Sequence, residues 1–274
     1  MGTSARTVKG RGDLLDRIAL GPVRVSRDNA IRIGTFITLV IGWELVSQSM
    51  NRVIMASPGR MIDALVEMST DGTLVDAWSE SLLILVVGLA LSSTSGVALG
   101  ILFGRFRRVD QFLEPILMAL FMTPKVALLP LIALWLGYQD PAKILLVFLF
   151  SFFEIFFTVR NGVRTIDREF VEVARAYSIP ESVMLRKVVL PAAVPYVITG
   201  LRLGLLHGMV GVVLAGFFLE NNGIGGLIFD AGGSFRVPEL FAALLTVAGV
   251  GLAISIGIRV LERAIAPWKE QMAR

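Results

Sequence analysis

Few residues in this chain of 274 could do chemistry, and the two that stand out lie inside apolar sequence. Glu154 interrupts the phenylalanine-rich run at 150–157, and His207 is the single histidine. A carboxylate at membrane depth is costly, and it indicates by default either a polar cavity or a buried pair. Glu154 and His207 could therefore form a structural polar pair, or they could face the path of a transported solute. The sequence leaves both interpretations open.

The groups used in covalent catalysis and metal binding are missing from the sequence. Without cysteine the chain has no disulfide, thiolate nucleophile or Cys-based metal site, and one histidine supplies no metal cluster. No Gly-Lys dipeptide occurs, so there is no P-loop to hold nucleotide phosphates, and HExxH and GxSxG motifs are absent as well. We expect no enzyme activity and no cofactor in this chain. Energy for any uphill transport must come from a partner or an ion gradient.

The most patterned polar stretch lies between two apolar runs in the second half of the chain. Residues 168–177 have the spacing of a short amphipathic helix. Ser178 and Glu181 then fit a capping box, with Pro180 inside the first turn of a second short helix at 181–189. Two short helices at a sharp angle predict a docking element for a partner protein. A helix that lies on the lipid surface is the alternative.

The composition places these residues in a membrane protein. Residues of the set AVILMFWYC make up 55% of the chain, charged residues only 18%, and the mean hydropathy is +0.74. This excludes a disordered chain and an ordinary soluble enzyme. Since a transmembrane helix needs about 20 mostly apolar residues, we expect six spans, at 31–50, 81–104, 112–137, 142–160, 194–219 and 240–261.

The third of these spans, 112–137, is the least regular. Pro115, Pro124 and Pro130 interrupt its helical hydrogen bonds. Broken helix at membrane depth must be covered by protein or must line a water-filled cavity.

The positions of the basic residues predict the orientation of the chain. Most of the 26 Lys and Arg residues fall in four stretches that six spans place on one side: 6–32, 105–108, 160–187 and 259–274. Because positive charge marks the cytoplasmic side, both termini are predicted to be cytoplasmic. The net charge of +4 then reports topology, and we expect no nucleic-acid partner.

The predicted organisation has three parts: a cytoplasmic segment at 1–30, a transmembrane domain at 31–264, and a cytoplasmic tail at 265–274. The docking element, at 165–190, lies within the transmembrane domain.

Segment 165–190 resembles the EAA loop of the membrane subunits of ATP-binding-cassette importers. That pattern runs Glu-Ala-Ala, three residues, Gly, about nine residues, and then an apolar run into Leu-Pro. Here Glu172, Val173 and Ala174 take the first three positions, Ser178 takes the Gly position, and 188–191 is the run into Leu-Pro. Val173 and Ser178 are departures, and the turn at Ser178 must do without the positive φ that glycine permits.

The resemblance extends over about 30–270. The chain is similar to the nitrate, sulfonate, taurine and bicarbonate branch of these permeases, with matching stretches at 124–137 (PKVALLPLIALWLG) and 223–228 (GIGGLI). It implies an all-α polytopic fold with six transmembrane helices, of the type I importer class, in the bacterial inner membrane. The implied substrate is a small, often anionic solute such as nitrate, bicarbonate, a sulfonate or an aromatic acid.

The resemblance also implies partners. These are cytoplasmic ATPase subunits that carry ATP and Mg²⁺, a second permease copy, a periplasmic or lipid-anchored solute-binding protein, and membrane lipid. By resemblance, the residues that couple to the ATPase are Glu172, Val173, Ala174, Tyr177, Ser178, Pro180 and Glu181.

Two sets of glycines recur every four residues in the second and fifth predicted spans: Gly96, Gly100 and Gly104, and Gly200, Gly204 and Gly208. Such stripes let helices approach closely in lipid, and packing within the chain is the simpler interpretation. The other interpretation is that the fifth span lines the translocation path. The candidate path residues are then Glu154, Gly204, His207, Gly208 and Glu220.

A different class of transporter also fits the sequence. Two six-span chains could form a self-sufficient channel or an ion-coupled secondary carrier. Co-purification separates the two hypotheses, because an importer subunit should bring an ATPase subunit with it.

Overall fold

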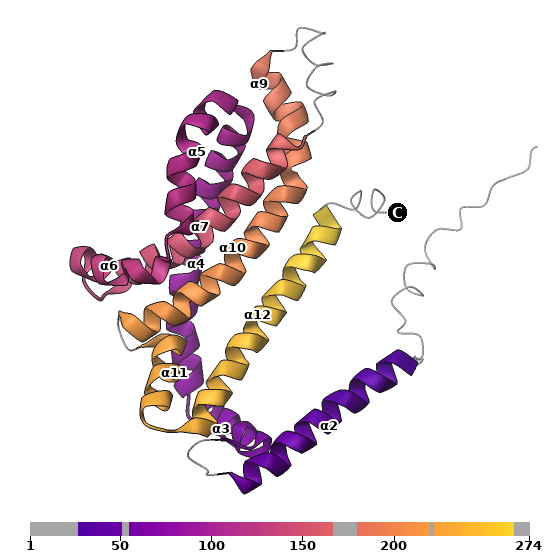
Figure 1. The fold of residues 1–274 in the computed structure, drawn as a ribbon, viewed down its shortest axis with the longest axis vertical. Coiled ribbons are helices and arrows are strands. Elements are labelled where there is room, and N and C mark those ends of the chain that lie inside the picture. Colours follow the sequence, from indigo (N-terminus) through magenta and orange to yellow (C-terminus); the bar gives the residue numbers. More distant parts are fainter. Residues whose placement is uncertain (1–26, 51–54, 167–179, 220–221, 266–274) are drawn as a thin grey trace, which may run out of the picture.

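The computed structural model describes residues 27–50, 55–166, 180–219 and 222–265, and every regular element in these ranges is a helix (Figure 1). In chain order the elements are α2 (Arg27–Ser49), α3 (Pro58–Thr70), α4 (Thr73–Arg105), α5 (Arg107–Met122), η1 (Lys125–Leu128), α6 (Leu129–Leu136), α7 (Asp140–Arg164), α9 (Glu181–Met184), η2 (Leu185–Val189), α10 (Leu190–Phe218), α11 (Gly223–Gly233) and α12 (Val237–Ile265).

Within these ranges, five helices are long and apolar enough to cross a membrane: α2, α4, α7, α9 continued by α10, and α12. They match five of the six predicted spans in place. The remaining predicted span, the third at 112–137, corresponds to α5 and α6 together. The all-helical, polytopic character expected from the sequence is therefore confirmed.

The third predicted span is broken, as its prolines indicate. α5 ends at Met122, and the axis turns by 85° before η1 and α6 continue. Thr123 has an extended backbone (ψ 127°), which is the conformation favoured before a proline, here Pro124. The Thr123 hydroxyl donates to the carbonyl of Ala119 at 2.8 Å and satisfies one group at the helix end. Pro115 lies inside α5, and Pro130 lies in the first turn of α6.

Helix α7 is the centre of the fold, with α4 packed on one side and α10 on another (Figure 1). One ridge of α7, with residues four apart, carries most of these contacts: Val147, Ser151, Ile155, Val159 and Val163. All five of these residues are buried.

Glycines on α4 and α10 receive this ridge. A Cβ built on Gly100 would lie 2.9 Å from Val159 Cβ, and one on Gly104 would lie 2.7 Å from Val163 Cβ. On α10, a Cβ on Gly204 would lie 2.5 Å from Ile155 Cγ1. The helices are thus closer than any residue with a side chain would allow. This confirms that the glycine stripes pack helices within the chain.

Two short helices, α3 and α11, lie at the end of the bundle where α4 begins (Figure 1). The sequence analysis did not predict either of them. Side chains of α4 hold the first turn of α11: the carboxylate of Glu80 accepts from the N–H of Gly223 at 2.9 Å, and the hydroxyl of Ser81 accepts from the N–H of Ile224 at 2.8 Å. Gly223 has a φ of +65°, which favours glycine at this turn.

Helix α2 projects away from the other helices (Figure 1). Its contact with them is at its C-terminal end, where Trp43 meets Phe241 of α12 edge to face at 5.9 Å. Most of its large apolar side chains are exposed, among them Phe36 and Leu39. Lipid or the apolar surface of a partner protein must therefore cover this helix.

Candidate coupling and translocation sites

The predicted coupling segment joins two helices at one end of the bundle. α7 ends there at Arg164, and α9 begins there at Glu181 (Figure 1). We call it the basic end, because it carries Arg105, Arg107, Arg164 and Arg186. Five of the predicted coupling residues lie outside the described residues: Glu172, Val173, Ala174, Tyr177 and Ser178. Pro180 and Glu181 are described.

The start of the second predicted docking helix differs from expectation. Helix α9 has Pro180 at its N-cap, and the Pro180 carbonyl accepts from the N–H groups of Val183 and Met184 at 3.0 Å each. The predicted capping box, with Ser178 at the N-cap, is therefore wrong. Glu181 instead forms an ion pair with Arg105, at the corner between α4 and α5. This pair ties the entry of α9 to the corner that precedes the broken span.

The second docking helix is also not a separate short helix. α9 passes through the π-helical stretch η2 directly into α10. Pro191 gives the physical reason. In a regular α-helix its ring would clash with the carbonyl four residues earlier, and the wider π-helical turn ahead of it relieves that clash. A movement of α9 is thus carried straight into the membrane-spanning part of α10.

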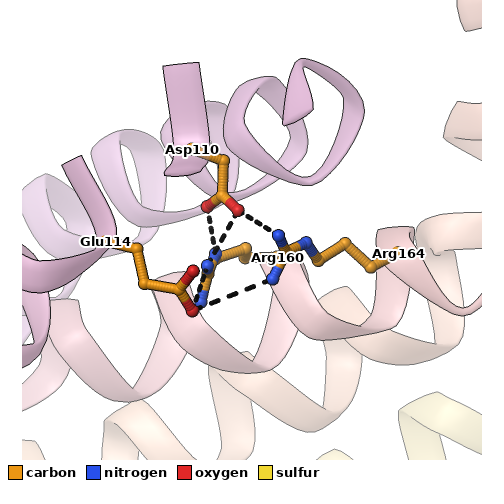
Figure 2. A network of polar contacts seen from close by, with 4 residues as sticks. All are labelled: Asp110, Glu114, Arg160 and Arg164. Carbon is orange, nitrogen blue, oxygen red and sulfur yellow. Dashed lines mark hydrogen bonds and ion pairs between the residues drawn. The ribbon is translucent and has the colours of Figure 1, made fainter. Parts of the chain in front are cut away.

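Four charged side chains, two of them buried, form a network just inside the basic end (Figure 2). Asp110 and Glu114 come from α5, and Arg160 and Arg164 come from α7, each pair one helical turn apart. Arg160 donates to Asp110 through two nitrogens, with Nη2 2.8 Å from Oδ2, and the same Nη2 lies 2.7 Å from Glu114 Oε1. Arg164 forms a further ion pair with Asp110 and lies 3.9 Å from Glu114.

Burial makes this network more than a surface contact. The Asp110 side chain is fully buried, and that of Arg160 is 2% exposed. The two carboxylates and the two guanidinium groups balance in formal charge, so neither buried ion is left without a partner. The network fixes α5, the first arm of the broken span, to the end of α7 that leads into the coupling segment.

Sequence reasoning missed this network because it assigned both arginines to a basic loop. A signal was present: acidic residues recur at 110 and 114, and basic residues recur at 160 and 164. Four-residue spacing on two neighbouring spans places each pair on one helix face. Which faces meet could not be read from the sequence.

A second group of polar side chains lies at membrane depth, and we call Lys125, Glu154 and His207 the mid-span cluster. Glu154 Oε1 lies 3.5 Å from His207 Nε2, so α7 and α10 bring together the two residues singled out first. The Glu154 side chain is 19% exposed and that of His207 is 47% exposed. Lys125, the first residue after the break, interacts electrostatically with Glu154.

The other candidate path residues are accounted for differently. Gly204 and Gly208 are buried, and each faces α7: a Cβ on Gly208 would lie 2.5 Å from the hydroxyl of Ser151. Packing explains both glycines without a role on a path. Glu220 lies outside the described residues.

A cavity of about 330 Å³ opens at the end of the bundle opposite the coupling segment. Its polar lining comes from Glu80, Ser81, Asp140, Lys143 and Asn222. Lys143 Nζ donates to Asn222 Oδ1 at 2.6 Å and lies 3.5 Å from Asp140 Oδ1. Together with the bonds from Glu80 and Ser81, these contacts anchor the chain between α10 and α11.

No group of three or more metal-binding side chains occurs in the part of the chain that the structure describes. The described polar clusters are ion pairs and hydrogen-bonded anchors that join helices.

Comparison with known proteins gives a consistent picture. A family model described as "Binding-protein-dependent transport system inner membrane component" matches residues 96–271. A Bacillus subtilis permease protein named for aliphatic sulfonates transport is 32% identical over 79% of this chain and 78% of its own length. The taurine transport system permease protein of Escherichia coli is 27% identical over 89% of this chain and 91% of its own length.

The nitrate import permease protein of a Synechocystis strain is 31% identical over 70% of each chain. The resemblance to the sulfonate, taurine and nitrate permeases is therefore confirmed. Because the family model covers more than half of the sequence, the chain belongs to the inner membrane components of binding-protein-dependent transport systems, as a permease subunit of an ATP-binding-cassette importer.

Proposed function

We propose that two copies of this permease subunit form the path for a small anionic solute across the bacterial inner membrane, and that separate ATPase subunits drive transport. Aliphatic sulfonates, taurine and nitrate, for which the relatives are named, all carry an anionic group. A solute-binding protein delivers the solute on the outer side. ATP and Mg²⁺ bind to the ATPase subunits on the inner side.

The arrangement of the basic end is the observation that carries the coupling role. The chain leaves α7 and re-enters α9 at this one end, and α9 is continuous with α10. The Arg105–Glu181 pair and the four-residue network link the same end to α4 and α5. A push on segment 165–190 by an ATPase subunit is thereby transmitted to α4, α5, α7 and α10 together.

The orientation follows from the same end. Its arginines and the basic segments at both termini favour the cytoplasmic side, so the ATPase meets segment 165–190 there. The coupling residues are Glu172, Val173, Ala174, Tyr177, Ser178, Pro180 and Glu181. On this orientation, 1–30 and 265–274 are cytoplasmic, and the 330 Å³ cavity opens toward the outer side.

We infer that the translocation path runs where polar side chains reach membrane depth. Glu154 and His207 lie beside the break between α5 and α6, and broken helix is tolerated in a membrane where it lines a cavity or is covered by protein. We keep Glu220 as a candidate path residue, whereas Gly204 and Gly208 contribute to the path only by holding α10 close against α7.

Charge reversal tests the coupling role. We expect Glu172→Lys to leave the permease assembled with its ATPase but to uncouple ATP hydrolysis from solute uptake in proteoliposomes. Uptake should fall at least about tenfold, since reversing one partner of a close charge contact costs more than about 1.4 kcal/mol. Uptake is scored with taurine, nitrate and ethanesulfonate as separate probes.

The matched control is Glu270→Lys, which makes the same charge change in the C-terminal tail, outside segment 165–190 in the sequence. Uptake with this variant should equal that of the unaltered protein. Normal uptake with Glu172→Lys would remove Glu172 from the coupling site.

A further inference from the structure

The chain places a cation at the break of its third span. Lys125 is the first residue of η1, directly after the extended Thr123–Pro124 link at which the axis turns by 85°. Broken helices in membrane proteins are recurrent sites of solute and ion binding, because their ends present polar groups at membrane depth. An ionisable residue at this depth is by default a functional residue, since keeping it there is costly.

The Lys125 ammonium is held by aromatic rings. Its Nζ lies 4.9 Å from the ring centroid of Phe121, 5.6 Å from that of Phe153 and 5.7 Å from that of Phe150. Among the described residues, none of the ion pairs within 4 Å includes Lys125. The rings stabilise the charge, but their faces leave the N–H donors of the ammonium available to a stronger acceptor.

Glu154 interacts both with this cation and with His207. Its carboxylate is 3.5 Å from His207 Nε2 and interacts electrostatically with Lys125. The side chain of His207 is 47% exposed, so this side of the cluster is open. Two donors on different helical elements therefore act on one carboxylate, and the cluster is partly exposed in the single chain.

The geometry points to an anion-binding site in transit, formed by Lys125 and His207, in which Glu154 is the internal counter-ion that the solute displaces. The ligand class is a small oxyanion: a sulfonate, nitrate or carboxylate, whose oxygens can accept from both donors. A cation is disfavoured by Lys125. This inference rests on the proposed function, because it assumes that the cluster faces the path.

The depth of the cluster argues against a lipid headgroup as the ligand. Glu154 is about 15 Å along α7 from Arg164 and about 21 Å from Asp140, at 1.5 Å per residue. A headgroup phosphate lies outside the hydrocarbon region, which is about 30 Å thick. A solute inside a water-filled path can reach this depth.

The absence of cysteine from the chain makes a direct test possible. Val210 is 49% exposed and follows His207 by three residues, on the same face of α10, so Val210→Cys places one reporter thiol beside the intact cluster. Its reaction rates are measured with a methanethiosulfonate that carries a sulfonate and with one that carries a quaternary ammonium. The ratio of the two rates reports the local preference for an anion.

We expect Lys125→Met to lower the ratio of anionic to cationic rates by at least about threefold, because the cluster loses one unit of positive charge. Glu154→Gln should raise the ratio, because it removes the competing carboxylate. Lys125→Arg keeps the charge and should keep the ratio. Lys269→Met, which makes the same change in net charge in the C-terminal tail, should leave it unaltered.

A ratio that is the same with Lys125 and with Met at this position would overturn the anion site, as would a thiol at 210 that reacts with neither reagent. The rates are measured on the permease alone and on the permease assembled with ATPase subunits. An unchanged ratio in a transporter that still couples ATP to uptake overturns the site and leaves the proposed function standing. A permease that binds no ATPase overturns the proposed function, and the ratio then still decides the anion preference.

Discussion

At the scale of residues, the two buried charges that join α5 to α7 are paired across the helices. Asp110 is the clearest case, since it is fully buried and accepts from both Arg160 and Arg164. The mid-span cluster follows a different rule: Lys125 is held by aromatic rings, and Glu154 is shared between two basic groups. The first arrangement suits a fixed joint and the second suits a site that exchanges partners.

Asp110→Asn tests the fixed joint. The substitution leaves Arg160 buried opposite a neutral group, and breaking one side of a buried pair costs about 3–5 kcal/mol. We expect the free energy of unfolding, measured by steric trapping in bicelles, to fall by this amount. Glu114→Gln, on a side chain that is 36% exposed, should cost less.

A double variant separates the loss of a charge partner from a general loss of packing. Asp110→Leu combined with Arg160→Leu removes the buried pair and leaves Glu114 beside Arg164. It should be more stable than Asp110→Asn alone, because no buried charge is orphaned. Equal destabilisation in the two variants would argue against an electrostatic joint between α5 and α7.

At the scale of elements, α7 organises the fold because one ridge of its side chains serves two neighbours. Val159 and Val163 fill the positions opposite Gly100 and Gly104 of α4, while Ile155 also meets Gly204 of α10. The four-residue spacing of ridge and glycines is what keeps these helices in contact along their length.

Gly104→Ala tests this close approach. The added Cβ would lie 2.7 Å from Val163 Cβ and 2.9 Å from the carbonyl oxygen of Arg160, so the helices must separate. We expect the free energy of unfolding to fall by about 1–3 kcal/mol, the usual cost of overpacking. Alanine is otherwise the better helix former by about 1 kcal/mol, so the sign of the change is informative.

Gly257→Ala is the matched control on α12. No atom lies within 4 Å of a Cβ built there, so only the gain in helix propensity applies. This variant should be as stable as the unaltered chain or more so. A Gly104→Ala chain that is equally stable would show that α4 and α7 do not pack as tightly as the structure has them.

The sequence predicts the long elements well because their signals are local. Runs of apolar residues mark the spans, and Pro124 marks the break in the third one. The short helix α11 was not predicted because five of its eleven residues are glycine, at 223, 225, 226, 232 and 233. So many glycines are typical of a loop. The helix forms because Glu80 and Ser81, far away in the sequence, satisfy its first N–H groups.

The residues of the candidate site were likewise only partly predictable from the sequence. Glu154 and His207 could be singled out from the sequence because each is a rare polar residue in an apolar run, and the structure brings them within 3.5 Å. Nothing in the sequence marks Lys125 as more than one charge within a mostly apolar span. Its role depends on rings from α5 and α7 that meet only after the chain has folded. Residues 167–179, where the family pattern places the coupling contacts, lie outside the described residues.

At the scale of the whole molecule, the single chain leaves much apolar surface for lipid and for other subunits to cover. α2 stands apart from the bundle (Figure 1). Both α5 and α6 carry exposed large apolar side chains, such as Phe112 and Trp135. These surfaces fit a subunit that works inside an assembly in the membrane. The basic end, with segment 165–190, is the part left for a soluble partner.

The dependence on an ATPase partner is the central claim of the proposed function, and co-purification tests it most directly. The tagged chain is expressed from its native genomic neighbourhood, solubilised in mild detergent, and the purified sample is assayed for associated subunits and for ATP hydrolysis. We expect an ATP-binding-cassette ATPase to co-purify and its hydrolysis to be lost when segment 165–190 is deleted. A chain that purifies without any ATPase, yet moves solute across liposomes down an ion gradient, would contradict the assignment as an importer subunit.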